Sequence, residues 1–144
     1  MCKIDDKIFE NFKEIAKRLS LMYKELVSNI NINSCECKAL IVISNQPNIT
    51  QTTLSQICGF DKPATSRLIN KLQQEDLVKK DFKDNNKKNT YLSLTKKGEE
   101  KTNEIKKKTN KLKNNYFNEL DVNDKEIFYN ILNKILDNKG VINA

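Results

Sequence analysis

The sequence predicts a mainly α-helical fold with one small β-hairpin, and three observations support this. Apolar residues recur at helical spacing in both the N-terminal and the C-terminal part of the chain. Between Thr50 and Gly98, two short helical patterns separated by a glycine precede two short strand patterns. A polar, asparagine-rich connector joins the strands. This order of elements is that of a winged helix-turn-helix. We expect one domain, 1–144, with this lobe at 45–98 and flanking dimerisation helices at 1–32 and 99–144.

A long amphipathic helix is predicted at the N-terminus, because its apolar residues lie three or four positions apart. They are Ile4, Ile8, Phe12, Ile15, Leu19, Met22, Leu26 and Ile30. The pattern breaks after Ile30, and Asn33 followed three residues later by Glu36 is typical of a capping box. A second helix should therefore open there and end before Pro47.

Two short helices and a hairpin should follow. Thr50 can cap a helix over 51–58, Gly59 suits a left-handed helix end, and Asp61 can cap the next helix. At 100° per residue, that helix gathers Thr65, Leu68, Ile69 and Leu72 on one packing side. Strands are expected at 77–82 and 90–94. Beyond them, Thr95 should cap a lysine-rich helix, and Asn123 with Glu126 should open the last helix as a capping box.

Positive charge is concentrated in the predicted lobe. Residues 61–98 carry 10 basic and 5 acidic side chains, whereas the net charge of the whole chain is +7. Such an excess favours a polyphosphate partner, which releases counterions on binding. A lysine-rich and asparagine-rich composition inherited from the source is the alternative explanation.

The polar side of the second short helix and the hairpin supply the candidate DNA contacts. Arg67 can donate two hydrogen bonds to guanine, Asn70 or Gln74 can pair with adenine, and the Ser66 hydroxyl can bond a base or a phosphate. Lysines of the hairpin would add mostly sequence-independent affinity. The predicted set is Lys62, Pro63, Thr65, Ser66, Arg67, Asn70, Gln74, Lys83, Asn86, Lys87 and Lys88. For any one of them, a solvated polar surface is the alternative.

Other kinds of site are poorly supported by the sequence. The chain has no histidine, no phosphate loop and no paired-carboxylate motif, so we expect no enzyme activity, cofactor or metal site. Cys35 and Cys37 lie near a predicted helix N-terminus and are candidate redox-active thiols, with inert cysteines as the alternative. No signal or membrane segment is found, which predicts a cytoplasmic protein.

The segment from Leu54 to Gly98 resembles the multiple-antibiotic-resistance-regulator (MarR) family of winged-helix transcription factors. The matching residues are Leu54 to Ile57, Ser66 to Leu68 with Leu72, Leu77 with Val78, and Leu94 to Gly98. The resemblance implies a homodimer built from the first and last two helices. Such a dimer would bind a palindromic promoter operator, usually as a repressor released by small phenolic compounds, metals or oxidants.

The resemblance also assigns roles by position. Ser66 and Arg67 match the family's pair that contacts DNA from the recognition helix. Asn86, Lys87 and Lys88 stand where the family's wing has an Asp-x-Arg signature, so the orienting carboxylate is missing and a lysine replaces the arginine. The family's inducers commonly settle between the dimerisation helices and the winged lobe. By that analogy Phe12, Tyr23 and Ile43 could line a pocket, with ordinary core packing as the alternative.

The sequence therefore predicts a homodimeric, sequence-specific transcriptional regulator of double-stranded DNA that responds to a small-molecule inducer or to stress. The broad apolar stripes of the terminal helices independently favour a symmetric dimer. Two alternatives stay open. One is a winged-helix module that binds a protein or structured RNA, since a fold does not fix a function. The other is a regulator that senses oxidants through a thiol.

Overall fold

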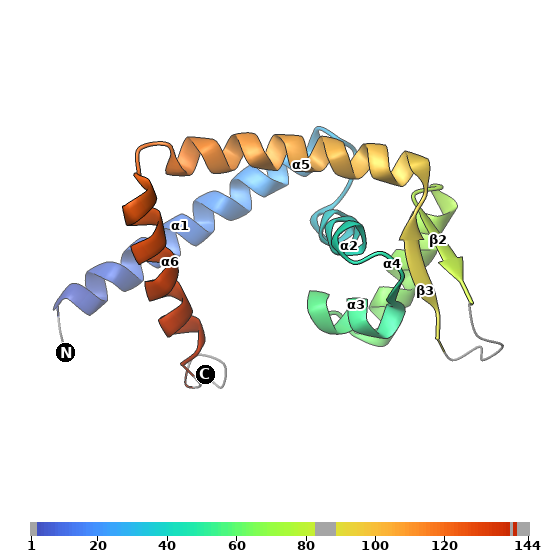
Figure 1. Ribbon diagram of the computed structural model, residues 1–144, viewed down its shortest axis with the longest axis horizontal. Coiled ribbons are helices and arrows are strands. Elements are labelled where there is room, and N and C mark those ends of the chain that lie inside the picture. The colour runs from blue at the N-terminus through green and yellow to red at the C-terminus, as the bar shows by residue number, and fades with distance from the viewer. Residues whose placement is uncertain (1–2, 83–88, 139, 141–144) are drawn as a thin grey trace. The chain divides into compact units, whose positions relative to one another are not determined.

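The computed structural model describes residues 3–82, 89–138 and 140 (Figure 1). Its elements are α1 (Lys3–Ser28), α2 (Ser34–Asn45), β1 (Ile49–Thr50), α3 (Gln51–Cys58), α4 (Lys62–Gln74), β2 (Val78–Asp81), β3 (Tyr91–Leu94), α5 (Lys96–Phe117) and α6 (Val122–Leu136). The predicted fold class, mainly helical with a small hairpin, is confirmed. The chain divides into two compact units, residues 1–107 and 108–144, with the boundary inside α5.

Side-chain caps set the helix boundaries in the first unit, as the sequence predicts. The amide oxygen of Asn33 accepts a hydrogen bond from the Glu36 backbone N–H at 2.8 Å. The Thr50 hydroxyl caps α3 and the Asp61 carboxylate caps α4 in the same way. Gly59 ends α3 in the left-handed region, at φ 71°. The turn between α3 and α4 is therefore fixed by local interactions at both of its ends.

The core of the first unit lies among α2, α3, α4, the sheet and the start of α5, which Figure 1 shows grouped together. Its largest apolar side chains, each exposed by less than 2%, are Leu40, Ile43, Leu54, Ile69, Leu72, Val78, Leu92 and Ile105. This core holds α4 so that only one side of the helix can reach solvent.

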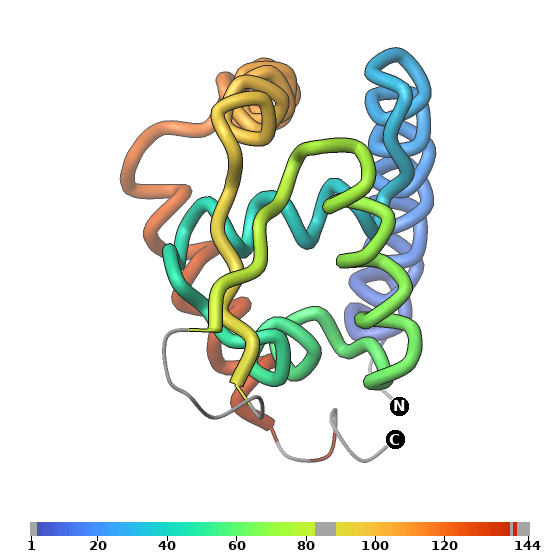
Figure 2. The backbone as a smooth tube through the Cα atoms, turned by 90° about the vertical axis from the view of Figure 1, so that its right-hand side faces the viewer, coloured from blue at the N-terminus to red at the C-terminus, as the bar shows by residue number. Residues whose placement is uncertain are grey.

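The sheet has three antiparallel strands in the order β1-β3-β2. Val78 pairs with Leu94 and Lys80 with Leu92, and Figure 2 shows β2 and β3 running side by side. The hairpin is thus confirmed, and the sequence did not indicate β1. The two residues of β1 are too few to form an alternating pattern in the sequence. This strand forms because Ile49 pairs with Leu92, far along the chain.

In the second unit, α6 starts earlier than predicted. Its N-cap is Asp121, whose carboxylate accepts a hydrogen bond from the Asp124 backbone N–H at 2.8 Å. The predicted capping box of Asn123 and Glu126 is therefore wrong, because the earlier aspartate already caps the helix and Asn123 lies within its first turn.

Both α1 and α6 carry apolar side chains that the chain itself leaves uncovered. In α1, only Leu26 and Val27 near its end are buried, and in α6 no residue is buried. None of the described helices combines the length and the apolar character needed to cross a membrane.

Candidate nucleic-acid interface

The polar side of α4 is accessible over the length of the helix. Lys62, Pro63, Arg67, Asn70 and Gln74 are exposed, and Ser66 is half-buried. On the opposite side, the predicted packing residues are buried, except Leu68, which is half-buried. Helical periodicity therefore separated the two sides of α4 correctly, and most of the predicted DNA-contacting residues share one surface.

Thr65 is the exception, and its assignment as a DNA contact is wrong. The residue has no exposed surface. Its hydroxyl donates to the Asp61 carbonyl at 2.8 Å and lies 3.2 Å from the Ser55 hydroxyl in α3. Ser55 in turn donates to the Phe60 carbonyl at 2.7 Å. Thr65 therefore helps to fix the angle between α3 and α4 and cannot reach a base or a phosphate.

Asn70 is exposed, but its amide oxygen is already occupied. The Lys80 ammonium group, from β2, donates a hydrogen bond to it at 2.5 Å. Pairing with adenine needs both the oxygen and the NH₂ group of the amide. Lys80 therefore takes one of the two lone pairs of the Asn70 oxygen, and adenine must use the other. Gln74 is exposed one turn further along α4.

A small polar hollow adjoins the N-termini of α3 and α4. Its volume is about 160 Å³, and its lining residues are Gln51, Thr52, Ser55, Lys62, Thr65 and Thr90. The Gln51 backbone N–H donates to the Thr90 carbonyl at 2.9 Å, which closes one side. The Ser55 and Thr65 hydroxyls already donate to backbone carbonyls. The donors left for a phosphate oxygen are the Thr52 and Thr90 hydroxyls and the Lys62 ammonium group. Of these residues, Gln51, Thr52, Ser55 and Thr90 were absent from the predicted set. Two of them follow the Thr50 cap directly, which is the sequence signal that could have found them.

A protein-family model matches part of the chain. Residues 30–85 match the model of the MarR family. The predicted resemblance to the MarR family is confirmed. A comparison with curated proteins finds no match.

Solved structures extend the likeness over most of the chain. MarR of Staphylococcus aureus in complex with salicylate and kanamycin is 19% identical, with a TM-score of 0.82, over 93% of this chain and 91% of that chain. A MarR transcriptional regulator from Methanosarcina mazei Go1 is 21% identical, with a TM-score of 0.77, over 99% and 94%. The PcaV transcriptional regulator of Streptomyces coelicolor, in complex with its natural ligand, is 16% identical, with a TM-score of 0.67, over 86% and 90%. The chain thus has the fold of MarR-family transcriptional regulators.

The remaining predicted DNA contacts follow β2 in the sequence. Lys83, Asn86, Lys87 and Lys88 lie outside the described residues, so their roles stay predictions. The strands that lead to them are described, and on β2 Lys79 is exposed.

The two candidate redox thiols, both in α2, differ sharply in accessibility. Cys37 is buried, and burial raises the pKa of its thiol. Because the thiolate is the reactive form, these two properties count against Cys37 as a redox-active residue. Cys35 is exposed. Cys58, across the α2 and α3 contact, is buried, and desolvation raises the pKa of its thiol against the opposing effect of Lys38.

The three residues proposed to line an inducer pocket have different environments. Phe12 is half-buried and Tyr23 is exposed, both on α1, whereas Ile43 is buried in α2. None of them lines the hollow beside α4. Their assignment stays a prediction. Over the described parts of the chain, no group of three or more metal-ligating residues is found.

Lys62 provides a direct test of the polar hollow. Lys62→Ala should weaken binding to every DNA duplex by a similar factor, because a contact with phosphate carries no base information. The slope of log K against log salt concentration should become shallower by about 0.9, the value for one phosphate contact. Mobility shifts over a salt series measure both quantities. Lys24→Ala removes the same charge from the exposed surface of α1, and equal slopes for the two variants would contradict the assignment.

Proposed function

We propose that this protein is a sequence-specific transcriptional regulator that binds a palindromic promoter operator as a homodimer. The observation that carries the proposal is the accessible polar side of α4 beside a phosphate-sized hollow. Both lie in the segment that holds most of the net positive charge. An α-helix presented in this way fits the major groove of B-DNA. Because DNA is its partner, we place the protein in the cytoplasm.

Arg67 is the residue best suited to read a base. The chain has two arginines, and Arg18 is paired with Glu14 on α1 at 2.8 Å. Arg67 is exposed in the first half of α4, and within the described part of the chain no carboxylate pairs with it. A guanidinium group donates two parallel hydrogen bonds to guanine O6 and N7, which gives discrimination between bases.

Arg67→Ala should reduce sequence discrimination far more than general affinity. Loss of a bidentate contact costs about 1–3 kcal/mol of discrimination, which corresponds to about 5- to 150-fold. Selection from a random duplex pool identifies the preferred site, and titrations then compare the selected duplex with a random one. Arg67→Lys keeps the charge but not the planar group, so it should lose discrimination while keeping the salt dependence.

The same titrations separate the proposed function from the alternative partners. Folded RNA and random duplex serve as competitors for the selected duplex. A protein that prefers folded RNA, or that enriches no site from the pool, would overturn the proposal.

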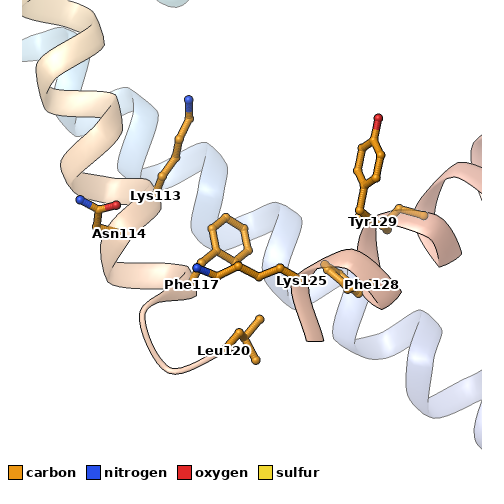
Figure 3. Close-up of a pocket in the computed structure, with 8 residues that line it drawn as sticks. Lys113, Asn114, Phe117, Leu120, Lys125, Phe128 and Tyr129 are labelled. Atoms are coloured by element: carbon orange, nitrogen blue, oxygen red, sulfur yellow. The ribbon is translucent and has the colours of Figure 1, made fainter. Parts of the chain in front are cut away.

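The homodimer part of the proposal rests on the uncovered apolar sides of the terminal helices. Ile8 and Phe9 on α1 are 45% and 64% exposed. Around α6, a hollow of about 340 Å³ is lined by Phe117, Leu120, Phe128, Leu132 and their neighbours (Figure 3). Exposed apolar surface of this kind typically marks an interface. A second copy would cover it, and a two-fold dimer places two recognition helices to read two half-sites.

Response to a small molecule is the last part of the proposal. Two MarR-fold structures, those with salicylate and with the natural ligand of PcaV, contain such compounds. We propose that the present chain is likewise a repressor that responds to a small molecule. Its predicted pocket is lined by Phe12, Tyr23 and Ile43. Titration of the protein-duplex complex with salicylate tests the extension. The thiol-based alternative now rests on Cys35, the exposed cysteine of α2.

A further inference from the structure

Glu36, in the first turn of α2, is the one charged side chain among the described residues that is buried, with 1% of its surface exposed. A carboxylate removed from water is costly unless charged and polar partners surround it. Its partners are the side-chain NH₂ group of Asn33, at 2.9 Å, and the ammonium group of Lys71. Lys71 lies in α4, so the buried charge joins the start of α2 to the recognition helix.

Helix capping alone does not explain this arrangement. In a capping box, the glutamate needs only to accept a hydrogen bond from the N-cap backbone N–H. That bond, from Asn33 to Glu36 Oε2, is the longest of the set at 3.4 Å. The other oxygen, Oε1, accepts hydrogen bonds from both the Asn33 side chain and Lys71. The carboxylate is therefore shared between the cap and α4.

The ammonium group of Lys71 in turn bonds within the protein, although the side chain is partly exposed. Its side chain is 52% exposed, yet its ammonium group contacts Glu36. The hydrogen bond with Glu36 and then its negative charge raise the pKa of Lys71, against a smaller effect of desolvation. The contact thus favours the charged form of Lys71, and the carboxylate of Glu36 provides its counter-charge within the protein.

The pair completes a set of three polar contacts that hold α4 along its length. Thr65 contacts Ser55 of α3 near the helix start, and Asn70 contacts Lys80 of β2 further along. Lys71 contacts Glu36 of α2 in the last turn. Because these contacts come from three different elements, together they restrict rotation of α4 about its own axis.

We propose that Glu36 is a positioning residue for DNA reading, which holds Lys71 and so fixes the rotation at which α4 presents Ser66 and Arg67. Lys71 then pairs with Glu36 and does not neutralise a DNA phosphate. The inference rests on the proposed function and concerns a residue that DNA cannot touch. An effect of Glu36 on sequence discrimination must therefore pass through α4 or through the stability of the fold.

The test compares Glu36→Gln, Lys71→Met and the double variant. The measured quantity is the ratio of affinities for the duplex selected by the wild-type protein and for a random duplex. Each single variant should lower this ratio about tenfold, and the double variant should lower it no further, since both remove the same contact. Lys71→Met should leave the salt slope unchanged, whereas loss of a phosphate contact would reduce it by about 0.9. Lys71→Arg keeps the ion pair and should retain the ratio.

Thr102→Val is the matched control for stability. Thr102 is also buried, at 1% exposure, and its hydroxyl donates to the Gly98 carbonyl within α5 and not to a residue of α4. This variant loses a buried hydrogen bond and should keep the wild-type ratio. Two results would overturn the inference. One is an equal loss of discrimination in Thr102→Val. The other is a shallower salt slope in Lys71→Met together with a wild-type affinity ratio in Glu36→Gln. Failure of the proposed function is seen separately, as a wild-type protein that enriches no duplex.

Discussion

Gly98→Ala is expected to destabilise the protein by about 3 kcal/mol, the upper range for forcing extra atoms into a packed site. Gly98 is buried in the first turn of α5. A methyl group there would lie 2.0 Å from the Leu77 carbonyl oxygen and 2.9 Å from its carbon. Both are backbone atoms, so no side-chain rotation relieves the clash. The backbone of Leu77 is held in turn by hydrogen bonds to Leu72 and Thr95, at 2.9 and 3.1 Å.

Urea unfolding followed by circular dichroism measures this effect as a lower midpoint. Gly59→Ala is the matched control, since no atom lies within 4 Å of the added methyl group. Its cost comes from the left-handed backbone at φ 71° alone and should be about 1 kcal/mol. A Gly98→Ala protein that unfolds at the wild-type urea concentration would show that α5 begins further from Leu77 than the structure indicates.

The elements that the sequence predicted well are those fixed by interactions within three or four residues. The caps at Asn33, Thr50 and Asp61 are contacts of this kind, and each determines where a helix starts. The early start of α6 was missed because two aspartates and an asparagine compete as caps within four positions, and propensity ranks them almost equally. Local rules therefore located the helices but could not choose between adjacent caps of similar strength.

The parts of the site that the sequence missed depend on contacts between distant segments. Thr90 joins the polar hollow because its carbonyl accepts a hydrogen bond from the backbone N–H of Gln51, a residue far earlier in the chain. Lys80 occupies the amide oxygen of Asn70 because the register of the hairpin brings β2 against α4. Glu36 looked like an ordinary cap residue, and only the packing of α2 on α4 revealed its bond to Lys71. Periodicity identifies the exposed side of a helix but not which exposed groups are already bound.

Phe128→Asp is expected to convert the proposed homodimer into a monomer. Phe128 lies on α6 beside Phe117 in the apolar hollow and is 40% exposed within its own chain (Figure 3). In a two-fold dimer the substitution occurs twice, so two unpaired carboxylates would be buried in one interface. We expect the dimer dissociation constant to rise at least about 100-fold, in the range of interface hot spots. Sedimentation equilibrium measures this as a fall in mass towards the 16.7 kDa of one chain.

Asn130→Asp adds the same charge to α6 and provides the control. Asn130 is exposed, and at 100° per residue it lies on the polar side of the helix, opposite the apolar stripe. This variant should stay dimeric, and circular dichroism should show equal helix content in both variants. The Phe128→Asp monomer should also lose most of its affinity for a palindromic duplex, because one recognition helix then reads one half-site without the second. A Phe128→Asp protein with the mass of the wild type would mean that the apolar side of α6 lies outside the interface.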